Sequence, residues 1–216
     1  MVITERPLRI SAEGVVLDGD LVIPDDPRGV VIFAHGSGSS RRSPRNRQVA
    51  AALQSARYAT FLMDLLTGDE EKIDSRTREL RFDIPRLAGR LTSATDWLTD
   101  RPDTAGLPLA AFGASTGAAA ALITAADRPE RVRLVISRGG RPDLAGEALA
   151  RVRAPTLMIV GGHDREVHQL NQEAAGRMTA PVQIEIVPGA THLFEEPGKL
   201  DAVIDLAIAA LNRHLG

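Results

Sequence analysis

One serine in the middle of the sequence stands in a setting that favours nucleophilic chemistry. Ser115 is the central residue of Gly113-Ala114-Ser115-Thr116-Gly117, which follows a short apolar run and precedes an alanine-rich stretch. A serine on a sharp turn from a strand to a helix needs very small neighbours, so that its hydroxyl stands clear of the sheet. The pattern therefore predicts an exposed nucleophile at Ser115, and a plain glycine-rich turn is the alternative interpretation.

A serine hydroxyl is a weak nucleophile until a base takes its proton, and a carboxylate must hold that base in the right tautomer. His192 and Asp164 both lie in loops that directly follow apolar runs. We therefore predict a catalytic triad of Ser115, His192 and Asp164. Glu166 and Glu195 are the alternatives for the residue that orients the histidine.

Acyl chemistry at a serine also requires donors for the negative charge that develops on the carbonyl oxygen. Ser37 lies in the small-residue loop that begins His35-Gly36, and Thr116 directly follows Ser115. Thr116 is the first residue of a predicted helix, and the helix dipole favours an anion near its backbone amide. We expect the backbone amides of Ser37 and Thr116 to form an oxyanion hole, and we expect His35 to be a structural histidine that bonds the loop backbone.

Arginines gather in the loop 41–47, and Arg138 and Arg141 follow a later apolar run. Guanidinium groups bind carboxylates and phosphates, so Arg42 and Arg138 are candidate substrate-binding residues. The alternative is that these arginines are solvated or paired with acidic side chains.

Metal and nucleotide sites are not indicated by the sequence. The chain has no cysteine, and the spacing of its histidines does not match known zinc motifs. The loop 36–40 lacks the Gly-Lys-Ser/Thr ending of a nucleotide-binding loop. We expect neither a metal nor a cofactor.

The elements that must position these residues are apolar runs alternating with amphipathic stretches, a pattern typical of parallel strands joined by helices. An antiparallel hairpin is expected over 8–11 and 15–24. The six further strands predicted are 30–34, 59–63, 109–112, 134–136, 156–160 and 182–187. These runs predict an α/β fold with an eight-stranded, mostly parallel sheet, helices on both faces, and a site at the carboxyl ends of the strands.

Apolar positions at helical spacing support that arrangement. One such face includes Val49 and Leu53, a second runs along 84–98 and a third along 203–211. The polar stretch 68–81 is expected to be a solvated loop with the start of a helix. Because 138–153 has room for at most one short helix, we expect no separate cap domain and a single domain over residues 1–216.

Composition narrows the choice of partners. A net charge of −2 and 3% aromatic residues disfavour nucleic-acid binding. No apolar stretch approaches the length of a membrane span, and residues 1–10 are charged where a secretory signal would be apolar. We expect a cytoplasmic protein that acts on a small ester-type molecule and binds neither nucleic acid nor membrane. The oligomeric state stays open.

The chain resembles the α/β-hydrolase superfamily, specifically its small, cap-free, dienelactone hydrolase-like members. The resemblance covers nearly the whole chain and rests on the strand order, His35-Gly36, the turn at Ser115, Asp164 in Gly-Gly-His-Asp and His192 in Gly-Ala-Thr-His-Leu-Phe. The order Ser115, Asp164, His192 along the chain is also that of the superfamily's triad. Dienelactone hydrolases themselves carry cysteine at the turn, where this chain has serine.

The resemblance implies a cofactor-free serine hydrolase that cleaves a small carboxylic ester, thioester or lactone through an acyl-enzyme on Ser115. Acyl transfer or carbon–carbon bond cleavage by the same triad is one alternative, because the triad does not by itself dictate the acceptor. A catalytically silent ligand-binding protein on the same fold is another.

Overall fold

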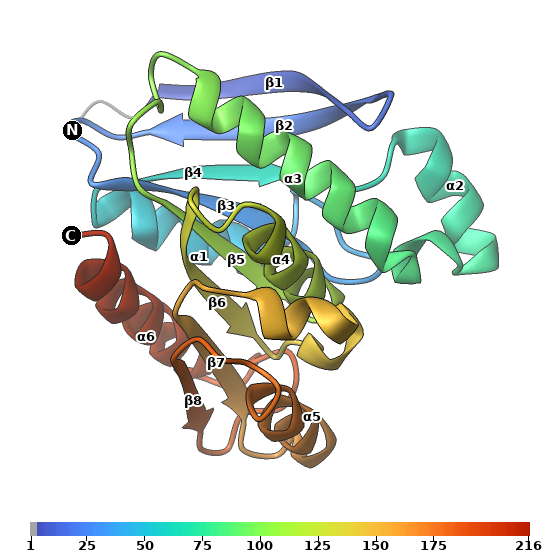
Figure 1. Ribbon diagram of the computed structural model, residues 1–216, viewed down its shortest axis with the longest axis vertical. Coiled ribbons are helices and arrows are strands. Elements are labelled where there is room, and N and C mark those ends of the chain that lie inside the picture. Colours follow the sequence, from blue (N-terminus) through green and yellow to red (C-terminus); the bar gives the residue numbers. More distant parts are fainter. Residues whose placement is uncertain (1–3) are drawn as a thin grey trace.

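Eight strands form one sheet in the order β1-β2-β4-β3-β5-β6-β7-β8 (Figure 1). The computed structural model describes the backbone of residues 4–216 and the side chains from residue 7 onward, so part of the predicted charged amino-terminal segment, residues 1–3, lies outside the described residues. The strands are β1 (Thr4–Ala12), β2 (Val15–Ile23), β3 (Gly29–Ala34), β4 (Tyr58–Met63), β5 (Leu109–Ala114), β6 (Val132–Arg138), β7 (Thr156–Gly161) and β8 (Val182–Val187).

Pairing within the sheet follows the prediction. β1 pairs with β2, and β2 with β4, in antiparallel fashion. The remaining pairs are parallel: β4 with β3, β3 with β5, β5 with β6, β6 with β7 and β7 with β8. Every predicted apolar run overlaps one strand. Strands β3, β4, β5 and β7 are buried at every position, which explains why they appear in the sequence as continuous apolar runs. The predicted eight-stranded, mostly parallel sheet is confirmed.

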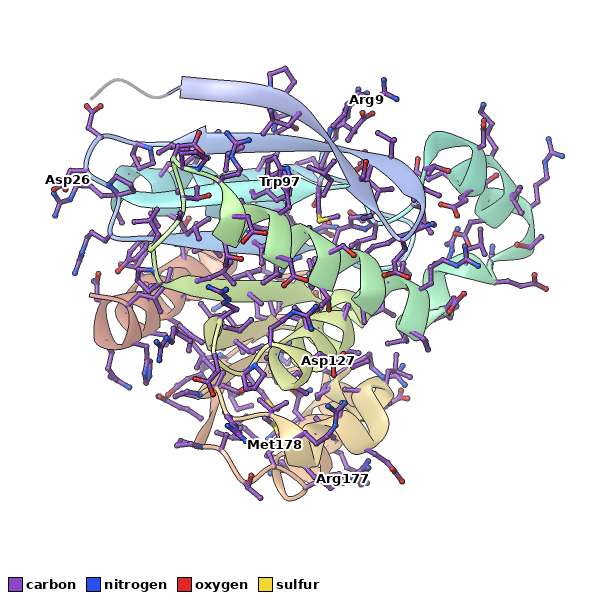
Figure 2. The ribbon with its side chains drawn as sticks, turned by 45° about the horizontal axis from the view of Figure 1, so that its top comes forward. Arg9, Asp26, Trp97, Asp127, Arg177 and Met178 are labelled. Carbon is purple, nitrogen blue, oxygen red and sulfur yellow. The ribbon has the colours of Figure 1, made fainter. Side chains whose placement is uncertain are left out.

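Helices cover both faces of the sheet. α1 (Pro44–Ser55) and α6 (Lys199–His214) contribute to one hydrophobic cluster, which includes Leu53 and Val203. α3 (Ile84–Asp100) and α4 (Thr116–Asp127) contribute to the other. On that face the α3 residue Trp97 packs on Phe61 of β4, with ring centroids 5.4 Å apart (Figure 2).

The connections on the α4 side are short. α5 (Arg165–Ala175) follows β7, and η2 (Pro142–Arg151), a 3₁₀ segment interrupted at Gly146, follows β6. Residues of η2 and α5 join the same hydrophobic cluster as α4. Between the strands of the described chain, residues 4–216, no inserted cap domain is present, as predicted.

The polar stretch after β4 differs from expectation. The stretch expected to be a solvated loop with the start of a helix forms the ten-residue helix α2 (Gly68–Thr77), followed by the 3₁₀ turn η1 (Leu80–Phe82). Thr67 and Glu70 form a reciprocal capping box at its start. Figure 1 shows α2 at the periphery, beyond the amino-terminal end of α3. The helix is exposed as predicted, but its end caps, rather than an apolar stripe, make it helical.

In the part of the chain that the structure describes, no helix combines the length and apolar character needed to cross a bilayer.

Candidate active site

The turn from β5 to α4 places Ser115 in a backbone conformation that residues other than glycine rarely adopt, with φ 50° and ψ −121°. The two glycines around it leave no room for a side chain. A Cβ on Gly113 would lie 2.4 Å from Ala118 Cα, and one on Gly117 would lie 2.2 Å from the carbonyl oxygen of Ala34. The glycines of the pattern are therefore required by close backbone packing, and the turn is the strained strand-to-helix turn that the sequence predicts.

Backbone hydrogen bonds from the next strand hold this strained turn. The amide of Ser115 donates to the carbonyl oxygen of Arg138 at 3.2 Å, and the amide of Arg141 donates to the carbonyl oxygen of Ser115 at 3.0 Å. Unusual dihedral angles persist only where the surrounding structure over-determines them. The end of β6 thus fixes where the hydroxyl of Ser115 points.

The structure brings Ser115, His192 and Asp164 together from three separate loops. His192 Nε2 lies 3.3 Å from Ser115 Oγ, and His192 Nδ1 lies 2.6 Å from Asp164 Oδ2. The side chain of His192 is 37% exposed, and that of Asp164 is 15% exposed. The imidazole is therefore linked to both neighbours and still open to solvent.

Two neighbouring loops carry the histidine and the aspartate, and the backbone joins them. The amide of His163 donates to the carbonyl oxygen of Ala190 at 2.9 Å. Glu195, an alternative for the orienting acid, instead pairs with Arg45 at 2.5 Å. Asp164 is the carboxylate that the structure places on His192.

His35 has the structural role expected of it. It is buried, its Nε2 accepts a hydrogen bond from the amide of Leu65 at 3.0 Å, and its Nδ1 lies 3.0 Å from the carbonyl oxygen of Gly36. Since Nε2 is an acceptor, the proton of the neutral ring sits on Nδ1 and is donated to Gly36. Burial lowers the pKa of His35, in keeping with this neutral form.

Ser37 and Thr116, the predicted oxyanion residues, lie side by side beside the serine. Their side-chain oxygens are 3.1 Å apart. The chain at Gly36 passes so near the turn that a Cβ there would lie 3.0 Å from Ser115 Cβ. Both Ser37 and Thr116 line a cavity of about 430 Å³.

The far wall of that cavity comes from α2 and its surroundings. Glu71, Asp74 and Ser75 of α2 line it, and so does Arg81 of η1. Arg81 is bound to Asp74 through its amide at 2.9 Å and its Nε at 2.6 Å. These residues lie in the stretch expected to be a solvated loop with the start of a helix, and none of them was predicted as a site residue. The capping box Thr67-x-x-Glu70 is the signal that could have found the helix.

The two candidate substrate-binding arginines are placed differently. Arg42 is exposed and lines the cavity. Arg138 is only 8% exposed and is not among the residues that line the cavity. Its Nη2 donates to Asn46 Oδ1 of α1 at 3.1 Å, so the side chain extends toward the α1 face of the sheet. That Arg138 contacts substrate stays a prediction.

Arg138 is nevertheless an unusual cation. Its Nε and Nη1 are buried without a hydrogen-bond partner among the described residues. Burial and the neighbouring positive charge of Arg45 lower the pKa of Arg138 to about 10. Other arginines of this region are ion-paired, as the alternative interpretation held: Arg41 pairs with Asp64 and Asp20, and Arg141 pairs with Asp143.

Among the described side chains, no group of three or more histidine, aspartate or glutamate residues is arranged to hold a metal ion.

Comparisons with known proteins place this geometry in a family. The family model described as the dienelactone hydrolase family matches residues 17–214. A crystal structure of a dienelactone hydrolase from Anabaena variabilis is 56% identical in sequence, superposes with a TM-score of 0.96 and matches over 99% of each chain. Est1E from Butyrivibrio proteoclasticus, a structure with bound ferulic acid, is 14% identical with a TM-score of 0.79 over 96% of this chain and 98% of that one, and so shares the fold.

Curated relatives from two strains of Mycobacterium tuberculosis are 54% identical over 211 residues. Their names describe them, as a provisional assignment, as phosphoribosyl transferases. The match covers 98% of this chain but 47% of each relative, so the chain spans about half their length. The sheet order, the turn at Ser115 and the family match agree with one another. The chain has the α/β-hydrolase fold and belongs to the dienelactone hydrolase family.

Proposed function

We propose that the protein is a serine hydrolase that cleaves a small carboxylic ester, thioester or lactone through an acyl-enzyme on Ser115. The observation that carries this proposal is the chain of contacts from Ser115 Oγ to His192 Nε2 at 3.3 Å and from His192 Nδ1 to Asp164 Oδ2 at 2.6 Å. We also propose that residues 1–216 act as one domain, because both hydrophobic clusters pack on a single sheet.

Each proposed residue has a defined task. With the Nδ1 proton of His192 donated to Asp164, the Nε2 lone pair faces Ser115 and can take its proton. Ser115 Oγ attacks the carbonyl carbon, and the amides of Ser37 and Thr116 stabilise the oxyanion. His192 then protonates the leaving oxygen or sulfur, and a water activated by the same histidine releases the acid.

The exposure of His192 supports hydrolysis over transfer to a second organic acceptor. Its side chain is 37% exposed, so water can reach the base directly. A silent binding protein has no physical need for a nucleophile, a base and an acid in contact. Acyl transfer and carbon–carbon cleavage stay as the outcomes that product analysis would detect.

Names of relatives are not carried over as substrates. The phosphoribosyl transfer named for the Mycobacterium tuberculosis relatives belongs to proteins of which this chain spans about half. The Anabaena variabilis protein is named a dienelactone hydrolase, and that name belongs to that protein. For this chain, the proposal extends to small ester-type molecules as a class.

The test is covalent labelling with a fluorophosphonate, combined with turnover of p-nitrophenyl acetate. We expect Ser115 to become labelled, and we expect Ser115→Ala to lose both labelling and turnover. Ser55→Ala, an exposed serine of α1 far from the turn in sequence, is the matched control and should behave like the wild type. Undiminished turnover in a folded Ser115→Ala variant would overturn the proposal.

A further inference from the structure

The position of the 430 Å³ cavity decides which part of a substrate it can hold. The leaving group must lie beside His192 Nε2, because that atom delivers its proton. The cavity is lined by Ser37 and Thr116 and by none of the residues in the loops of Asp164 and His192. A substrate whose carbonyl oxygen faces Ser37 and Thr116 therefore places its acyl group, rather than its leaving group, in the cavity.

The cavity offers both donors and acceptors of hydrogen bonds. Ser40 Oγ accepts from the amide of Arg42 at 3.2 Å, which leaves its own O–H free to donate. Ser75 Oγ donates to the carbonyl oxygen of Lys72 at 2.8 Å, which leaves its lone pairs free to accept. Both serines line the cavity. A ligand that both donates and accepts, as a hydroxyl does, can use both kinds of group.

Charged groups of opposite sign face the cavity as well. Asp74 is already engaged by Arg81, whereas Glu71 and Arg42 are exposed. Burial and the negative charges of Asp64 and Asp74 raise the pKa of Glu71, while Arg41 and Arg42 act against that rise. The surroundings of Glu71 are thus unfavourable to a further negative charge.

Few large aliphatic side chains line the cavity. Leu66 and Leu87 are the large aliphatic side chains that line it, and both are buried. A long alkyl chain would have to lie against serines and charged side chains, which leaves polar groups without partners. A compact ring with hydroxyls at its edge matches this distribution better.

We propose that the acyl group accepted by this enzyme is compact, neutral and polyhydroxylated, of the kind found in esters and lactones of sugar acids, and that Glu71 and Arg42 bind its hydroxyls. This inference rests on the proposed function and adds a substrate class to it. Glu71 accepts from a hydroxyl, and Arg42 donates to a neighbouring one. An acidic acyl group is disfavoured because its carboxylate would meet Glu71.

Three ethyl esters with the same six-membered carbon ring test the proposal. They are the esters of trihydroxycyclohexanecarboxylic acid and cyclohexanecarboxylic acid, and the monoester of cyclohexanedicarboxylic acid. We expect kcat/KM for the trihydroxy ester to exceed that of each of the others by at least about tenfold, because only its hydroxyls can form hydrogen bonds with both Glu71 and Arg42, and hydrogen bonds to charged groups are the stronger ones. Equal values for the three esters, or a preference for the unsubstituted or acidic ring, would overturn the inference.

Variants of Glu71 test whether this side chain causes the preference for the trihydroxy ester. Glu71→Leu should lower kcat/KM for the trihydroxy ester by about tenfold relative to kcat/KM for the cyclohexanecarboxylic ester. Glu71→Gln, which keeps an acceptor oxygen, should restore part of the loss. Asp69→Asn, at an exposed α2 position outside the cavity lining, is the matched control. An unchanged preference in Glu71→Leu would remove Glu71 from the site.

Failure of this inference can be told apart from failure of the proposed function. If no ester is turned over and Ser115 is not labelled by a fluorophosphonate, the hydrolase proposal itself fails. If p-nitrophenyl acetate is cleaved through Ser115 and the three ring esters show no preference for hydroxyls, only the substrate class is wrong.

Discussion

Two walls of the same cavity are held in place by different physical means. One wall includes Gly36, Ser37 and Thr116, which lie against the turn at Ser115. At that turn Gly113 and Gly117 allow close backbone packing, and the amide of Ser115 donates to the carbonyl oxygen of Arg138 at the end of β6. The opposite wall, α2, has a single buried residue and projects Ile73 into solvent. It is attached to α3 mainly through Glu70, whose carboxylate meets both terminal nitrogens of the buried Arg90 at 2.7 Å.

Because of this difference, the residues proposed for the reaction and those proposed for substrate choice lie on differently stabilised parts of the fold. Atoms that must be placed to within a fraction of an ångström lie on the part of the fold fixed by packing. Side chains that choose among substrates lie on a polar helix attached by ion pairs and end caps. Changes at the first wall should therefore abolish the reaction, whereas changes at the second should alter stability or preference.

The largest effect is expected for His192→Ala, which removes the imidazole that contacts Ser115 Oγ next to the packed wall. Loss of the base should lower kcat for p-nitrophenyl acetate by on the order of 10⁶-fold, by analogy with other triads. Steady-state kinetics would measure it, with circular dichroism to check folding. His214→Ala, an exposed histidine in the last helix, is the matched control and should keep full activity. A loss below about tenfold would assign the base to another residue.

Asp164→Asn should follow, with a loss of about 10⁴-fold in kcat and little change in folding. The amide side chain would present an N–H to His192 and favour the wrong tautomer of the ring. The same assay measures this effect. Glu195→Gln serves as the comparison, because Glu195 is paired with Arg45 and not with His192. If Glu195→Gln proved as damaging as Asp164→Asn, the assignment of the orienting acid would be wrong.

At the second wall, Glu70→Gln should act on stability instead of chemistry. The Arg90 hydrogen bonds hold the pKa of Glu70 at about 2, against an ordinary value of 4.5. A depressed pKa stabilises the folded state above pH 4.5, and that contribution is lost as the pH falls toward 2. We expect Glu70→Gln to lower the free energy of unfolding at neutral pH by roughly 3 kcal/mol, because Arg90 is left buried and unpaired.

Urea unfolding of wild type and Glu70→Gln across that acidic range measures the effect. The gap between the two proteins should shrink as the pH falls, while kcat for p-nitrophenyl acetate at neutral pH stays within a few-fold of the wild type. Asp69→Asn, in an exposed pair with Lys72 on the same helix, should leave unfolding unchanged. A gap that is independent of pH would show that the Glu70–Arg90 pair does not anchor α2.

The smallest effect is expected for Arg42→Ala, because that side chain is exposed. KM for the trihydroxycyclohexanecarboxylic ester should rise by about threefold to tenfold, with kcat unchanged, since one hydrogen-bond donor is lost in the bound state. The control is Arg76→Ala, an exposed arginine of α2 outside the cavity lining. A rise in KM confined to acidic esters would instead support the anion-binding role first considered for Arg42.

The contrast between the walls also explains how much the sequence could predict. Strands β3, β5 and β7 are buried on both faces, so their apolar runs stand out in the sequence. Ser115, Asp164 and His192 follow three of the strands, and parallel topology brings such positions to one edge. The structure places these three side chains in contact, at the sheet edge where the sequence analysis expected them.

Other features depend on contacts that a single sequence does not display. The helix α2 has no apolar stripe, and its anchor, Arg90, lies twenty residues beyond Glu70. α5 was not predicted; it buries Asn171, whose amide bonds the carbonyl oxygens of Gly140 and Val167. The hydrogen bond from Arg138 to Asn46 joins a strand to a helix that lie 92 residues apart, and no local pattern marks it. All three features depend on polar side chains that pair across long stretches of the sequence.

The most direct test of the central claim is to trap the acyl-enzyme. Wild-type protein mixed with p-nitrophenyl acetate, quenched rapidly with acid and digested, would be analysed by mass spectrometry for one added acetyl group. We predict the acetyl group on Ser115 in the wild type and its absence in His192→Ala. Rapid turnover of the ester with no acetylated Ser115 at any quench time, or with the acetyl group on another residue, would contradict the account.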